Sequence, residues 1–143
     1  MPLFSTLSKK EKIDIATKTW DYVITANTKE SIIASWFVLH HQHKIKHEPK
    51  PIWYPFCPMI HEKLMEKVKD KNILMIDVFF PELIHKQIKR ICHTILVING
   101  YSSSKQNDCV KKFFGENIIH EYGSRVSGLE ITKNIFKVCE DEE

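Results

Sequence analysis

The sequence predicts an all-α fold, a single domain of about six helices over residues 1–143. The main observation is a stripe of isoleucines at steps of four and three, which is typical of one face of an α-helix: Ile84, Ile88, Ile91, Ile95 and Ile98. Pro81 suits a first helical turn, and Gly100 can take the left-handed conformation that ends a helix. The chain has only four glycines, which argues against a β-sandwich or barrel rich in tight turns.

The composition indicates a globular protein that can bury a real core, because 143 residues are 43% hydrophobic. The 21 Lys and Arg residues against 18 Asp and Glu give a net charge of +3, which does not by itself indicate nucleic-acid binding. Four cysteines without a close pair favour a thiol-bearing intracellular protein over a disulfide scaffold. No apolar run is long enough to span a bilayer, and the N-terminus lacks the apolar core of a signal peptide, so we expect a cytoplasmic protein.

The first half of the chain contains two predicted helices and a loop. Ser8 and Glu11 form a capping-box pattern at the start of the first helix, and helical spacing of apolar residues continues to Val23. Thr28 can cap the second helix, which runs into a histidine-rich segment. Residues 48–58 include four prolines, which exclude a continuous helix, and their large apolar side chains predict a loop packed on the core.

The second half is predicted as a series of helices. A short helix covers residues 60–68. Residues 73–80 are apolar and β-branched and could form a strand, but no partner strand is evident, so we interpret them as a buried connection or helical turn. The isoleucine helix spans 81–100, another helix runs from 108 to 123, and a last one covers 129–138.

Three of these segments resemble the globin family. Residues 7–23 have a Leu-Ser start and a late tryptophan, as in the first globin helix. Residues 81–98 resemble the distal-side helix of neuroglobin-like and cytoglobin-like sequences. Residues 114–123, with Gly115 ahead of His120, resemble the proximal helix. The resemblance implies a divergent globin-like bundle, either truncated or rebuilt at its C-terminal helices.

The resemblance also implies a heme cofactor, with gas (dioxygen) binding, sensing or redox chemistry as the function. His120 would be the axial ligand of the iron, and Gln87 would donate a hydrogen bond to bound dioxygen from the distal side. Ile91 would crowd the sixth coordination position, and Phe56 would stack against the porphyrin.

Two of these assignments have alternatives. Aligned strictly from Gly123, Ile119 instead of His120 takes the proximal position. His85 is a second distal candidate, but it lies roughly 200° around the helix from Gln87, so both cannot face one pocket.

Other kinds of site are less well supported by the sequence. His40 and His43 have a spacing at which a helix can chelate a metal, but an exposed, partly protonated patch explains them as well. The chain has no nucleophile-elbow, phosphate-loop, dinucleotide-glycine or zinc-protease motif, so we expect no enzymatic activity. We also expect neither nucleic acid nor a membrane as a partner.

A second hypothesis belongs to a different functional class. The chain would be a heme-free, all-helical interaction module that self-associates or binds a partner protein through an exposed apolar face. Ile119 at the strict proximal position and the missing C-terminal globin helices favour this hypothesis.

Overall fold

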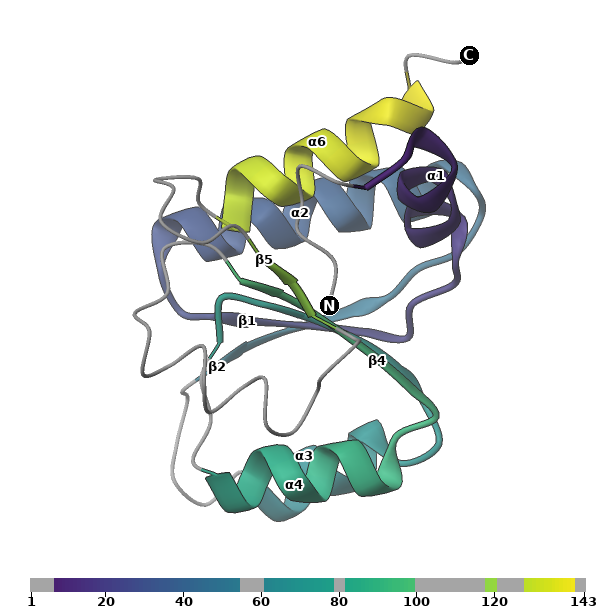
Figure 1. Ribbon diagram of the computed structural model, residues 1–143. Helices are drawn as coiled ribbons and strands as arrows, with labels where there is room; N and C mark the ends of the chain where they lie inside the picture. The colour runs from purple at the N-terminus through teal and green to yellow at the C-terminus, as the bar shows by residue number, and fades with distance from the viewer. Residues whose placement is uncertain (1–6, 55–60, 79–81, 100–117, 121–127, 141–143) are drawn as a thin grey trace.

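The computed structural model describes residues 7–54, 61–78, 82–99, 118–120 and 128–140. Over these residues the protein has three layers, with a sheet of five parallel strands between two layers of helices (Figure 1). The strands are β1 (Tyr22–Ala26), β2 (Lys50–Tyr54), β3 (Asn72–Ile76), β4 (Thr94–Asn99) and β5 (Ile118–His120). Their order in the sheet is β2-β1-β3-β4-β5. The prediction of an all-α, globin-like bundle is therefore wrong.

The helices divide between the two faces of the sheet (Figure 1). On one face lie α1 (Lys9–Thr17), α2 (Lys29–Lys44) and α6 (Gly128–Glu140), and on the other lie α3 (His61–Val68) and α4 (Glu82–Ile91). Each face has its own hydrophobic core, and β3 contributes to both. Ile73 and Met75 pack in the core with α3 and α4, whereas Leu74 and Ile76 pack in the core with α1, α2 and α6.

The isoleucine stripe that predicted one long helix is divided between two elements. Ile84 and Ile88 are buried in α4, which ends when the amide of His93 donates to the carbonyl of Lys71. The chain then enters β4, where Ile95 and Ile98 are buried on opposite faces of the sheet. A parallel strand covered on both faces is a continuous apolar run, so two isoleucines three positions apart fit it as well as they fit a helix.

The interpretation of residues 73–80 as a connection or helical turn is also wrong, because residues 73–76 belong to the central strand β3. Its partners were concealed in the sequence for two reasons. Val23 of β1 continues the helical spacing of the first helix, but α1 in fact ends at Thr17. The strand β2 contains Pro51, and proline is tolerated there because β2 lies at the edge of the sheet.

The locally determined elements agree with the sequence prediction. Ser8 and Glu11 form the expected capping box, with both backbone-to-side-chain hydrogen bonds present. Thr28 caps α2, and the predicted third and last helices correspond to α3 and α6. The helix predicted over 108–123 falls mostly outside the described residues, and its described part, 118–120, is strand β5. Within the described ranges, no helix combines the length and apolar character needed to cross a bilayer.

Candidate functional site

The strand order identifies one edge of the sheet as a candidate ligand site. The carboxyl edge, as we call it, is where β1, β3 and β4 end, at Ala26, Ile76 and Asn99. The neighbouring strands β1 and β3 are followed by helices on opposite faces, α2 and α4 respectively (Figure 1). In doubly wound sheets of this order, ligands bind outside the carboxyl ends of the strands where the connections diverge.

The helix α2 begins at the carboxyl edge, and only two residues separate it from the end of β1. Its cap is Thr28, whose backbone is extended and whose hydroxyl accepts from the amide of Ser31 at 3.3 Å. The first amides of a helix have no intrahelical partner and carry the positive end of the helix dipole. Thr28 provides a neutral acceptor for one of them, and Asn27 to Glu30 are exposed to solvent.

The helix α6 begins at the same edge, but its first turn is capped by a carboxylate. Asp77 directly follows β3 with a left-handed φ of 51°, and its amide donates to the carbonyl of Ile98 at 2.9 Å. Its Oδ2 accepts from the amide of Gly128, the first residue of α6, at 3.0 Å. The negative charge of Asp77 therefore already complements the dipole of α6.

Two buried hydroxyls lie in the layer between the sheet and these helices. Thr25, next to the last residue of β1, and Thr132, four residues after Gly128, are both fully buried. Neither hydroxyl has a hydrogen-bond partner in the described structure. Thr25 shares the face of β1 with Val23, which packs in the core with α2 and α6. An unsatisfied buried hydroxyl costs about 1–3 kcal/mol, so these two groups call for an explanation.

The chemistry of the carboxyl edge favours an anion at α2 over a metal ion. The exposed groups at the start of α2 are backbone amides, the hydroxyl of Thr28, the cationic side chain of Lys29 and the carboxylate of Glu30. Across the part of the chain that the structure describes, no three His, Cys, Asp or Glu residues are arranged to hold a metal ion.

The residues predicted to bind heme are not brought together at this edge. Gln87 and Ile91 lie on α4 and line an open groove of about 570 Å³ with Arg90 and three residues of α3, namely Glu62, Met65 and Glu66. His120 is in β5, paired with Asn99 of β4, and Ile119 is paired with Ile98. Phe56 lies outside the described residues.

The bundle from which heme binding was inferred is absent from the described fold. Gln87 and Ile91 are on a helix that packs on one face of the sheet, whereas His120 is a residue of an edge strand. Heme binding, with His120 as the iron ligand, stays a prediction that this fold does not favour.

The histidines considered for other sites lie in different surroundings. His85 is buried, and burial lowers its pKa to about 4. His43 contacts Glu48 at 2.8 Å on the surface, and His47 contacts the carbonyl of Trp20 at 2.6 Å. His41 is buried with its ring edge-on to Phe136. These side chains are directed to different partners, so the histidine-rich segment is not one chelating cluster.

The sequence reasoning missed the groups at the carboxyl edge because it missed the strands. An Asp directly after a buried apolar run, and Asn-Thr after another, are typical of residues at the ends of parallel strands. Had residues 22–26 and 72–76 been read as strands, Asp77 and Thr28 would have been identified as neighbours of one site.

Comparison with protein-family models finds none that matches this chain, and comparisons with curated proteins and with solved structures find no match either. The functional argument therefore depends on the geometry of the chain itself.

Proposed function

We propose that this protein binds a small ligand with an anionic group, such as the phosphate of a mononucleotide, at the carboxyl edge of its sheet. The observation that carries the proposal is the strand order, which makes the ends of β1 and β3 a topological switch point from which α2 begins. Helix N-termini at such points are suited to phosphate, because their free amides and their dipole both favour negative charge.

The contrast between the two helices supports α2 as the anion site. The first turn of α6 already holds the carboxylate of Asp77. The cap of α2 is the neutral hydroxyl of Thr28, and the acidic residue of its first turn, Glu30, is exposed to solvent. We place the anionic group at the amides of Lys29 and Glu30, because the amide of Ser31 already donates to Thr28, with the side chain of Lys29 as a cationic contribution.

The buried hydroxyl of Thr25 supports the same position. It lies on the strand that leads into this turn, on the sheet face that α2 covers, and has no partner. A ligand, or a water molecule that it orders, can satisfy this hydroxyl. Thr25 then contributes to affinity without being exposed to solvent in the free protein.

The proposed activity is binding, not catalysis. The expectation from the sequence that the chain is not an enzyme stays a prediction, as does its cytoplasmic location.

The proposal is tested by recording amide ¹H–¹⁵N spectra while titrating inorganic phosphate and then adenosine monophosphate. We expect saturable shifts confined to residues 25–31. Lys29→Glu should weaken binding roughly threefold or more, because it puts a negative charge where the anion docks.

The matched control is Lys10→Glu. It makes the same charge change at an exposed residue in the first turn of α1, a helix of the same layer. Shifts spread over the whole surface, or equal losses in the two variants, would show non-specific attraction and contradict the proposal.

A further inference from the structure

The helix α2 exposes apolar side chains on the side that faces away from the sheet. Its buried residues form the inner side: Ser31, Ala34, Ser35, Val38, His41 and Gln42. Its exposed residues form the outer face, as we call it: Lys29, Glu30, Ile33, Trp36, His40, His43 and Lys44. Trp36 is 63% exposed and Ile33 is 38% exposed, although side chains of both kinds are usually buried.

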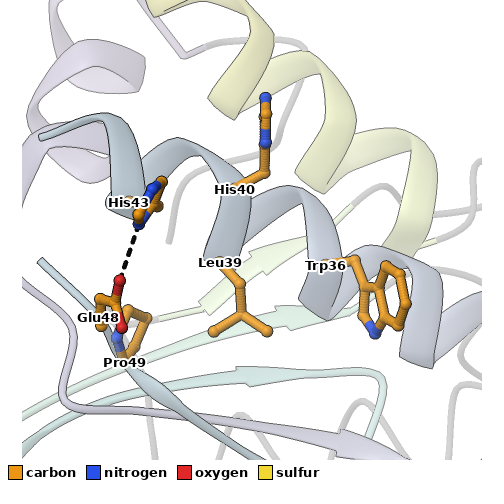
Figure 2. A pocket seen from close by; sticks show the side chains of 6 residues that line it. All are labelled: Trp36, Leu39, His40, His43, Glu48 and Pro49. Atoms are coloured by element: carbon orange, nitrogen blue, oxygen red, sulfur yellow. Dashed lines mark hydrogen bonds and ion pairs between the residues drawn. The ribbon is translucent and has the colours of Figure 1, made fainter. Parts of the chain in front are cut away.

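Trp36 forms a ridge at the centre of the outer face, because it lines two separate hollows. One hollow, of about 380 Å³, is lined by Trp36, Leu39, His40, His43, Glu48 and Pro49 (Figure 2). The other, of about 330 Å³, is lined by Ile33, Trp36, Phe37 and His40. Figure 2 shows the indole of Trp36 at one end of the first hollow and the contact between His43 and Glu48 at the other. The apolar centre of the outer face therefore projects into solvent between shallow hollows.

Lysine side chains lie around this apolar centre. Lys29, in the first turn of α2, lies about 20° around the helix from Trp36 and seven residues before it. Lys133 of the neighbouring α6 is exposed, and its Nζ is 5.8 Å from the ring centre of Phe37. Lys44, the last residue of α2, is exposed too, but it already interacts within the chain and contributes less.

The acidic side chains near the outer face lie at its border or have partners in the chain. Glu30 lies about 120° around the helix from Trp36, so it is not beside the apolar centre as Lys29 is. The carboxylate of Glu48 is 2.8 Å from Nδ1 of His43 (Figure 2). Glu130 of α6 is exposed, but it interacts within the chain. The centre of the face therefore combines apolar area with positive charge.

This combination fits an anionic lipid surface better than a protein partner. Protein interfaces are depleted of lysine, and ordering its long side chain costs entropy. At a lipid surface, lysine keeps its ammonium group among the phosphates while its alkyl stem lies along the apolar region. Tryptophan prefers the same depth, because its ring is apolar and its N–H is polar.

We propose that the outer face of α2 docks on a membrane surface that contains anionic lipids, with Trp36 and Ile33 inserted between the headgroups. Lys29 and Lys133 then lie against lipid phosphates. No membrane partner is expected from the sequence, which has no apolar run long enough to span a bilayer, but a helix face that lies on the surface needs no such run. The proposal does not depend on the ligand site at the carboxyl edge, and its test leaves Lys29, which belongs to that site, unchanged.

The proposal is tested by cosedimentation of the full chain with vesicles of phosphatidylcholine alone and of phosphatidylcholine mixed with phosphatidylserine. We expect binding to the mixed vesicles that falls as salt is raised, and little binding to the neutral ones. Trp36→Ala should weaken binding roughly tenfold or more, because the indole provides most of the inserted apolar area. The matched control is Leu83→Ala, on α4 in the opposite layer, because Leu83 is also 63% exposed. This variant should bind as the wild type does.

A charge reversal tests the contribution of lysine. Lys133→Glu should weaken binding to the mixed vesicles roughly fivefold or more, because one lysine near an anionic surface contributes about that factor. Lys86→Glu makes the same change at an exposed residue of α4 and should have a clearly smaller effect. Circular dichroism establishes that each variant is folded.

Four results would each overturn the proposal. They are absence of binding to the mixed vesicles, equal binding to neutral and mixed vesicles, equal effects of Trp36→Ala and Leu83→Ala, and equal losses in the two charge variants. Self-association that depends on Trp36, in a chain that leaves the vesicles unbound, would instead identify a second copy as the partner of this face.

Discussion

The carboxylate of Asp77 accepts a hydrogen bond from the amide of Gly128 and fills the space that a Cβ at residue 128 would need. The two residues are 51 positions apart in the sequence. Their contact joins the end of the central strand to the start of α6, the last described helix.

We predict that Gly128→Ala destabilises the protein, by roughly 1–3 kcal/mol, because the new methyl group overlaps the carboxylate and forces α6 or Asp77 to move. Urea unfolding followed by circular dichroism measures the change in the free energy of unfolding. In an Asp77→Gly background the same substitution should cost close to nothing, because alanine favours a helix and the overlapping group is gone. An equal cost in both backgrounds would show that the contact does not constrain residue 128.

We predict that Gln42→Leu is among the most destabilising single substitutions in the core, at roughly 3 kcal/mol or more. The fully buried side chain of Gln42 donates to the carbonyls of Ala16 and Lys18 and accepts from the amide of Trp20. Leucine leaves these three backbone groups without their partner. It does so where the chain passes from α1 into β1.

The measurement for Gln42 is again urea unfolding, with Asn134→Ala as the control. Asn134 also accepts a long-range hydrogen bond, from Lys12 at 2.9 Å, but on the surface, so its loss should cost under about 0.5 kcal/mol. Similar losses in the two variants would contradict the role assigned to Gln42.

We predict that His85 makes stability depend on pH. Burial lowers its pKa from 6.5 to about 4 in the folded protein, so between these values the unfolded chain binds more protons than the folded one. The free energy of unfolding therefore falls as pH is lowered from about 6.5 to about 4. His85→Leu should remove this part of the pH dependence, whereas His93→Gln, at an exposed position, should leave it in place. Parallel pH profiles for the wild type and His85→Leu would refute the prediction.

We predict that hemin added to the purified protein gives a broad absorption band without saturation at one heme per chain. The positions expected to bind it are divided between α4 and β5. His120→Ala should leave the spectrum unchanged. A sharp Soret band that saturates at one heme per chain and disappears in this variant would instead support the heme hypothesis.

The helix caps were predicted correctly from the sequence, because each cap depends only on residues within one helical turn. The capping box of Ser8 and the cap at Thr28 depend on neighbours three residues away, and both are present. The strands could not be recognised in this way, because Ile95 to Ile98 satisfy a buried strand and a helix equally well. Asp77 and Gly128 are neighbours only once β3 and α6 are in place, and no local pattern predicts such a pair.

The position of β1 in the sheet has a consequence for how the chain folds. β1 pairs with β2 on one side and with β3 on the other, although β3 follows β1 by nearly fifty residues. During synthesis, one edge of β1 therefore stays open until residues 72–76 have left the ribosome. Pairing between such distant segments slows folding, and an unpaired apolar strand is prone to aggregate until its partner strand has been synthesised. Refolding from urea should be slow, and chains that end before residue 72 should be captured by chaperones.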